Sequence, residues 1–115
     1  MLPAANRLKS TADFGKIFKY GKVSENEFLR IKFIKNQKGC SRFGFIVSNK
    51  FAKKAAERNL IKRRLRAAVG FLLKNVKPGF DVAVWPKAAL KKSEYRMLVD
   101  NLKNILIKND ILFVQ

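Results

Sequence analysis

The stretch KKAAERNLIKRRLRAA at residues 53–68 decides how this chain is organised. Its apolar residues recur with the 3.6-residue period of an amphipathic helix, and they form one stripe that contains Ile61, Leu65, Ala68, Val69 and Leu72. We predict a helix that runs from this stretch to about Asn75. Seven of the fourteen residues at 53–66 are Lys or Arg, against the single acid Glu57. Because cations spaced four residues apart repel one another, the helix gains nothing from this charge without an anionic partner.

The cationic side of this helix lies next to the apolar stripe and not opposite to it. Arg58, Lys62 and Arg66 flank the stripe at i, i+4 and i+8, and Asn59 and Arg63 lie beside them. We therefore expect these side chains to stand at the edge of the packed body, held by a stiff element.

The whole chain shares this charge. It has 26 Lys and Arg against 8 Asp and Glu, a net charge of +18, which attracts polyanions over long range. Nucleic acid is the default partner, and an anionic membrane surface is the second. No apolar run approaches the ~20 residues of a membrane span, and no signal peptide is visible, so we expect a cytoplasmic protein. With 115 residues and 48% hydrophobic composition, residues 1–115 should fold as one domain, and its charge predicts that it binds nucleic acid.

The residue types leave little room for chemistry by the protein itself. There is no His and the single Cys is Cys40, which excludes an internal disulfide, a Cys/His zinc site and any nucleophile that depends on His. A metal nuclease built from distant carboxylates stays open, but no spacing favours one. We expect no catalytic residue and no metal-ligating residue.

Helix and strand patterns flank the basic stretch. Ser10 as N-cap, with Asp13 as a variant capping box, predicts a helix with Phe14, Ile17 and Phe18 on one side and Gly21 at its end. Alternating residues at 28–35 and 42–48, joined by the turn NQKGCS, predict an antiparallel hairpin. A short extra strand near Lys22 and Val23 is weakly signalled.

The second half of the chain adds one strand and one helix. A turn at Pro78 and Gly79 precedes the apolar run FDVAVW at residues 80–85, which we predict to be a buried strand. We expect Trp85 in the core, with its N–H bonded to a carbonyl oxygen. A last helix from near Ser93 places four apolar residues on one face, namely Leu98, Leu102, Ile105 and Leu106. The fold class is therefore α+β, built on a small sheet.

Three segments resemble the protein subunit of bacterial ribonuclease P. NRLKSTADFGKIFKYGK at 6–22 resembles the amino-terminal box of that family, and GFDVAVWPKAAL at 79–90 resembles its last strand. The specific match is RFGFIVSNKFAKKAAERNLIKRRLRAA at 42–68, with the pattern Arg-Asn-x-x-Lys-Arg-x-x-Arg after a strand. Two positions depart from the family pattern. Leu60 stands where an Arg is common, and Pro86 leaves Lys87 alone where a basic pair is usual.

The resemblance implies a fold and a function. The expected fold is a ribosomal-protein-S5-domain-2-like two-layer sandwich of order α-β-β-β-α-β-α, with a left-handed crossover. The protein would be the accessory subunit of an endoribonuclease whose RNA subunit, with Mg²⁺ bound mainly by that RNA, removes the 5′ leader of precursor tRNA. Its partners would be the catalytic RNA and precursor tRNA, with no membrane and no DNA.

The resemblance also implies two binding regions. The basic helix would bind the catalytic RNA through Lys53, Lys54, Arg58, Asn59, Lys62, Arg63 and Arg66. A cleft between the first helix and the sheet would bind the single-stranded leader through Phe14, Phe18, Phe33, Ser48, Asn49, Lys50 and Lys87.

The residues by themselves leave alternatives open. Phe14 and Phe18 at i, i+4 favour a core position over base stacking, and Phe33 and Ile31 could line the cleft or face the helices. A ribosomal or other structural RNA-binding protein is the alternative function, and a basic protein that binds DNA or a membrane surface is the third.

Overall fold

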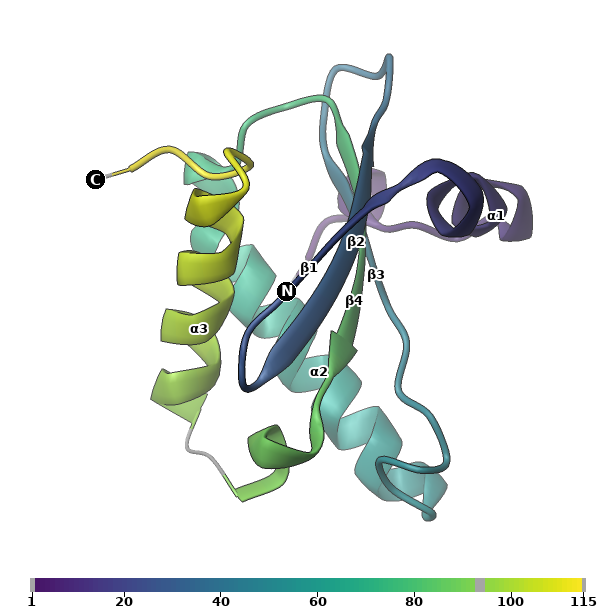
Figure 1. The fold of residues 1–115 in the computed structure, drawn as a ribbon, viewed down its shortest axis with the longest axis vertical. Helices are drawn as coiled ribbons and strands as arrows, with labels where there is room; N and C mark the ends of the chain where they lie inside the picture. The colour runs from purple at the N-terminus through teal and green to yellow at the C-terminus, as the bar shows by residue number, and fades with distance from the viewer. Residues whose placement is uncertain (1, 93–94, 115) are drawn as a thin grey trace.

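The computed structural model describes residues 2–92 and 95–114 and is shown in Figure 1. The elements are α1 (Thr11–Tyr20), β1 (Lys22–Glu25), β2 (Leu29–Lys35), β3 (Arg42–Phe45), α2 (Ala55–Leu72), β4 (Phe80–Pro86) and α3 (Tyr95–Lys108). Short 3₁₀ turns lie at Ala4–Asn6, Leu73–Asn75 and Ala88–Lys92. The predicted order α-β-β-β-α-β-α is confirmed, including the weakly signalled strand β1. The predicted start of the last helix near Ser93 lies outside the described residues.

The strand order corrects one prediction. The sheet runs β1-β2-β4-β3, so β2 and β3 are not partners and the predicted hairpin between them is wrong. β2 pairs antiparallel with both β1 and β4, whereas β3 pairs parallel with β4. α2 is the crossover that joins the parallel strands β3 and β4.

β4 lies inside the sheet, between β2 and β3, and its residues are buried on both faces. Asp81 to Val84 are all buried, which is possible only for a strand covered on both sides. The loop at residues 36–41 binds the start of β4 instead of closing a hairpin. Asn36 N donates to the Gly79 carbonyl oxygen at 2.7 Å, and Phe80 N donates to Ser41 Oγ at 3.0 Å. Gly79 has a φ of +93°, a backbone conformation that glycine adopts without strain.

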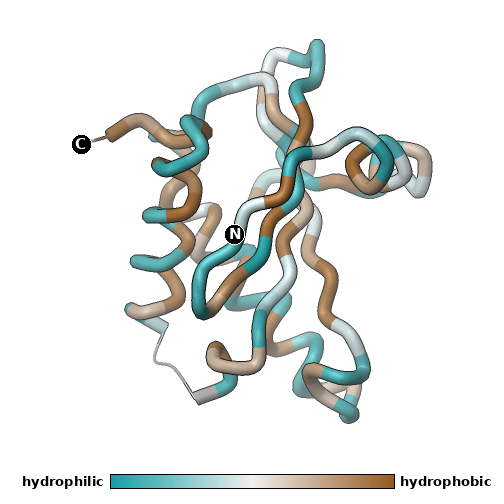
Figure 2. The backbone as a smooth tube through the Cα atoms, in the orientation of Figure 1, coloured by the Kyte–Doolittle hydropathy of each residue, from teal (hydrophilic) through white to brown (hydrophobic). Residues whose placement is uncertain are grey.

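The two faces of the sheet are covered differently. α2 and α3 lie against one face, and α1 lies against the other (Figure 1). The main core fills the first face, and it includes Leu29, Ile31, Phe43, Val82, Val84, Leu65, Ala68, Val69, Leu72, Leu98, Leu102, Ile105 and Leu106. Hydrophobic and hydrophilic residues alternate along the strands and helices in Figure 2, as expected for elements with one buried side. The predicted apolar stripes of α2 and α3 are thereby confirmed, except that Ile61 is only half-buried.

A smaller apolar cluster joins α1 to the opposite face. Its buried members are Leu8, Ile17 and Ala83. The predicted helix caps are confirmed, because Ser10 Oγ accepts a hydrogen bond from Ala12 N at 3.1 Å and Gly21 ends the helix. None of the described helices is long and apolar enough to span a bilayer.

Candidate nucleic-acid interface

The entry of α2 is held by one of its own cations. The N-cap residue, Lys54, makes no side-chain capping bond. Arg58 Nη1 instead donates to the carbonyl oxygens of Ala52 at 2.9 Å and Lys53 at 2.7 Å, so the guanidinium fixes the loop that enters the helix. Arg58 is half-buried, and part of its hydrogen-bonding capacity is already in use.

The remaining cations of α2 form no ion pair within the part of the chain that the structure describes. Among the described residues, ion pairs join Arg42 to Asp13 and Asp81, Lys77 to Asp110, and Lys87 to Glu25, and none of these cations belongs to α2. Lys62 and Arg66 are half-buried, whereas the others are exposed, namely Lys53, Lys54, Arg63 and Arg64, together with Asn59. Leu60, at the departure from the family pattern, is 39% exposed and does not enter the core.

α2 meets α1 and the N-terminal segment in one hollow of about 310 Å³. It is lined by Arg7, Leu8, Lys9, Phe14, Phe43, Gly44, Phe45, Lys62 and Arg66. The structure therefore brings Phe14 together with Lys62 and Arg66, which the sequence analysis had assigned to separate regions. The ring of Phe14 beside four cations suits a flexible polyanion whose bases are available for stacking.

Phe14 is seated on the backbone of β3. A Cβ atom at Gly44 would lie 2.2 Å from Cζ of Phe14, so glycine is required for the ring to lie where it does. Phe14 is half-buried, while Phe18, one turn later, is 45% exposed. The two ring centroids are 6.0 Å apart. The helix thus anchors one ring and presents the next.

An ion network fixes α1 over the sheet. Arg42 bonds Asp81 on β4 through Nε at 2.9 Å and Nη2 at 2.6 Å, and it bonds Asp13 on α1 through Nη1 at 3.1 Å. Hydrogen bonds to the Asp81 carboxylate raise the pKa of the Arg42 guanidinium above its ordinary value, with a smaller contribution from Asp13. Asp13 thus pairs with Arg42 and does not complete the predicted capping box.

The polar residues predicted for the cleft do not line the hollow of Phe14. Ser48, Asn49 and Lys50 are exposed in the turn that follows β3. Ser48 and Lys50 line a separate hollow of about 270 Å³ near Pro86. Lys87 is half-buried and lies 3.8 Å from a Glu25 oxygen, so its charge is partly offset.

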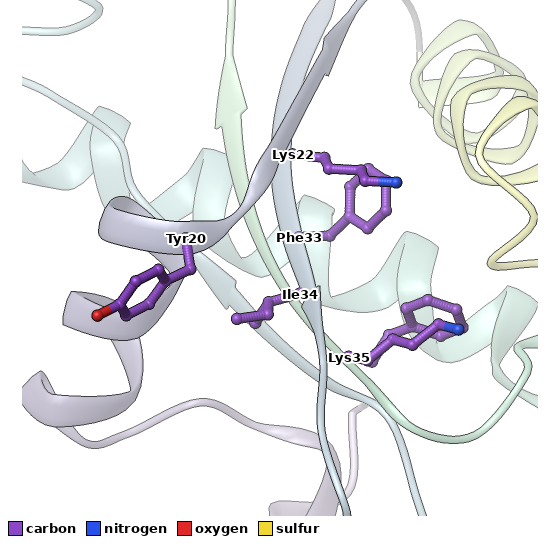
Figure 3. A pocket seen from close by; sticks show the side chains of 6 residues that line it. Tyr20, Lys22, Phe33, Ile34 and Lys35 are labelled. Atoms are coloured by element: carbon purple, nitrogen blue, oxygen red, sulfur yellow. The ribbon is translucent and has the colours of Figure 1, made fainter.

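Phe33 does not join this group. It lies on the α2–α3 face, packs against the main core and meets Phe80 at 6.3 Å between centroids. Figure 3 shows Ile34 and Tyr20 on the α1 side of β2, with Phe33 directed to the other side. The placement of Phe33 in the cleft is therefore corrected, and Ile31 is fully buried on the same face as Phe33. Both follow from the apolar alternation Leu29, Ile31, Phe33, which belongs to the larger core.

Four residues of this surface were not assigned to it from the sequence. Arg7 and Lys9 line the hollow of Phe14. Trp85 is half-buried on the α1 face, 5.8 Å from Phe18 between ring centroids, and Arg30 lies over its ring at 5.6 Å. Trp85 packs against the smaller apolar cluster but is only half-buried, so the expected core position is only partly met. Among the described residues its side chain forms no hydrogen bond, so the expected carbonyl partner is wrong. Alternation along β4 puts Asp81, Ala83 and Trp85 on one face of the sheet and Val82 and Val84 on the other, and this pattern could have placed Trp85 on the α1 face.

The acidic groups of this surface are engaged structurally. Asp13 and Asp81 are both paired with Arg42. Across residues 2–92 and 95–114, no group of three or more His, Cys, Asp or Glu side chains is arranged to hold a metal ion. The described surface therefore offers hydrogen-bond donors and cations to an anion, while Asp13 and Asp81 are already paired with Arg42.

Comparison with known proteins agrees with this geometry. Residues 2–110 match the family model for ribonuclease P. A ribonuclease P protein component of a Pseudanabaena species is 37% identical over 113 residues, which cover 97% of each chain. The ribonuclease P protein of Thermotoga maritima superposes with a TM-score of 0.82 at 34% identity, covering 89% of this chain and 96% of that one. A Staphylococcus aureus ribonuclease P protein mutant with defective mRNA degradation activity gives a TM-score of 0.85 at 27% identity, covering 94% and 91%.

Proposed function

Because the chain belongs to the ribonuclease P protein family, we propose that it assists a catalytic RNA in removing the 5′ leader of precursor tRNA. The observation that carries this proposal is the hollow where Lys62 and Arg66 of α2 meet Phe14 of α1. One molecule can there hold a structured RNA along a helix and a single strand across a sheet.

The catalytic RNA binds along the cationic side of α2. Phosphates that lie against Lys62, Arg63 and Arg66 relieve the repulsion between these side chains and release condensed counterions. Asn59 adds hydrogen bonds that a bare charge lacks, and Lys53 and Lys54 extend the contact before the helix. Arg58 contributes mainly by fixing the entry of the helix, because it already binds two carbonyl oxygens.

The single-stranded leader crosses the α1 face. A base can stack on an aromatic ring only when it is splayed out of a duplex, which favours a single strand over the tRNA body. Phe18 offers an exposed ring, and Phe14 offers the accessible part of a ring fixed on Gly44. Ser48, Asn49, Lys50 and Lys87 supply polar and cationic contacts farther along.

The RNA subunit performs the cleavage. Mg²⁺ prefers carboxylate and phosphate oxygens, but the carboxylates beside the proposed leader path, Asp13 and Asp81, are both ion-paired with Arg42. These donors do not fit a protein-held Mg²⁺, and we assign the ion to the RNA. A role in tRNA maturation places the protein in the bacterial cytoplasm.

Reconstitution tests the proposal. The chain is added to a bacterial ribonuclease P RNA with precursor tRNA at low Mg²⁺, and release of the 5′ leader is followed with time. We expect faster leader removal than with the RNA alone, and no cleavage by the protein alone. RNA binding without any acceleration would favour the alternative of a structural RNA-binding protein, and cleavage by the protein alone would contradict the assignment of chemistry to the RNA.

A further inference from the structure

Trp85 occupies a place that suits neither a core residue nor an ordinary surface residue. It lies near the end of the central strand β4, half-buried, and its ring faces the side of the sheet that α1 covers. Two groups beside the ring, Phe18 and Arg30, are themselves exposed. Phe18 lies 5.8 Å away between centroids, at an angle of 40° between the ring planes, and the Arg30 guanidinium lies 5.6 Å above the indole. Phe14, Phe18 and Trp85 therefore form a row of three aromatic rings. The apolar cluster under this row buries the rings only in part.

The indole N–H is also available. Buried Trp side chains usually donate this proton to a carbonyl oxygen. In the described part of the chain the indole N–H of Trp85 donates to no partner, and no buried side-chain nitrogen or oxygen lacks one, so Nε1 reaches the surface. A ligand on this face can accept that hydrogen bond.

The charge around the ring suits a phosphate backbone. Arg30 is directly opposite Trp85 across the β2–β4 pair and enters no ion pair within residues 2–92 and 95–114. Lys32 donates to the Phe18 carbonyl oxygen and so ties the end of α1 to the same strand. Arg30 can stack on a base or grip a phosphate, because its guanidinium is planar and carries five donors.

We propose that Phe18, Trp85 and Arg30 form a stacking site for one nucleobase of the single-stranded RNA that crosses the α1 face, with the indole N–H as an additional donor. This inference rests on the proposed function and assigns a specific task to a residue outside the predicted cleft. The site lies beyond Phe14 on the row of rings, so it extends the bound strand from the hollow at Lys62 and Arg66 toward the end of β4.

The fluorescence of Trp85 offers a direct test, because it is the single tryptophan of the chain. The protein is titrated with a short oligoadenylate and, separately, with an abasic ribose-phosphate strand of the same length. We expect the oligoadenylate to quench the indole emission in a saturable way and the abasic strand to leave it nearly unchanged. Equal quenching by both strands would overturn the stacking site, since it would report charge alone.

Two variants test the site in the assembled enzyme. Trp85→Leu keeps an apolar side chain but removes the ring, whereas Trp85→Phe keeps a ring. We expect Trp85→Leu to weaken binding of leader-bearing precursor tRNA by about tenfold, with mature tRNA unaffected and Trp85→Phe much closer to the natural chain. Phe71→Leu is the matched control, because Phe71 is 72% exposed in α2 and does not line the Phe14 hollow.

The outcomes separate this inference from the function on which it rests. Acceleration of leader removal by the natural chain, with equal losses for Trp85→Leu and Phe71→Leu, would overturn the stacking site alone. Absence of acceleration by the natural chain would contradict the proposed function, whatever the oligoadenylate shows. Thermal melting of each variant verifies that binding is compared between folded proteins.

Discussion

The two faces of the sheet use the same strands for different purposes. On the α2–α3 face, Ile31, Phe43 and Val84 are buried in a continuous apolar core. On the α1 face, the small cluster of Leu8, Ile17 and Ala83 shares the surface with an ion network, exposed rings and cations without partners in the described structure.

This difference shows where stability and recognition are located. Most of the buried apolar residues belong to the larger core, so apolar burial on that face contributes most to stability. The α1 face is therefore free to carry polar groups and incompletely covered rings. Substitutions in the larger core should change unfolding, and substitutions of the exposed rings and cations on the α1 face should change RNA binding.

The largest expected effect is on the core face. Phe43→Ala removes a ring that is 1% exposed, and the free energy of unfolding should fall by about 3–5 kcal/mol. Urea denaturation measures the loss. Phe18→Ala is the matched substitution on the other face, and it should cost less than about 1 kcal/mol because that ring is 45% exposed. Similar losses for the two variants would erase the distinction between the faces.

The second largest effect is expected at the ion network of Arg42, Asp13 and Asp81. Arg42→Met leaves the Asp81 side chain, which is 8% exposed, without its cation, and it frees α1 from β4. We expect stability to fall by about 3 kcal/mol, together with weaker binding of leader-bearing substrate. Lys77→Met breaks a pair whose acid, Asp110, is 86% exposed, and it should cost less than about 1 kcal/mol. A neutral effect of Arg42→Met on denaturation would show that the network does not hold α1.

Phe14→Ala should change substrate choice. Loss of one stacking ring should weaken the binding of precursor tRNA by about 1–3 kcal/mol, while mature tRNA, which has no leader, should bind as before. The ratio of the two dissociation constants is the measurement, since it cancels any loss of folded protein. An unchanged ratio would return Phe14 to a purely structural role on Gly44.

The smallest effect concerns single charges on α2. Lys62→Ala and Arg66→Ala should each reduce the slope of log K against log salt by about one unit for binding to the RNA subunit. Arg64→Ala makes the same change in net charge from an exposed position roughly opposite Lys62 on the helix, at ~100° per residue, and should leave the slope unchanged. Equal slopes for all three variants would mean that the wrong side of α2 has been assigned.

Much of the fold follows from local patterns. The caps of α1, the stripe of α2 and the buried face of α3 each depend on residues close together in the chain, where helical periodicity is informative. The cations of α2 also lie where their spacing placed them, at the edge of the packed body. The pairing of β2 with β4 could not be found in this way, because a six-residue turn favours a local hairpin and only the two-sided burial of β4 overrides it.

The candidate site was predicted less completely for a related reason. Alternation assigns Phe33 and Ile34 to opposite faces of β2, but it does not say which helices cover each face. Phe33 was therefore placed with Phe14, and Trp85 was placed in the core. The more apolar side of β2 and of β4 faces the larger pair of helices, α2 and α3. This rule places Phe33 on the α2–α3 face and Trp85 on the α1 face.

The central position of β4 has a consequence for biosynthesis. β2 and β3 both precede α2 in the chain, yet neither can complete its pairing until Phe80–Pro86 has left the ribosome. Until that moment the nascent chain exposes its apolar strands and its basic segment together, beside a ribosomal surface rich in RNA. Because β2 and β3 pair only through β4, which is synthesised after them, rapid completion of synthesis protects this chain from aggregation. The interval in which the unpaired strands are exposed includes the translation of α2.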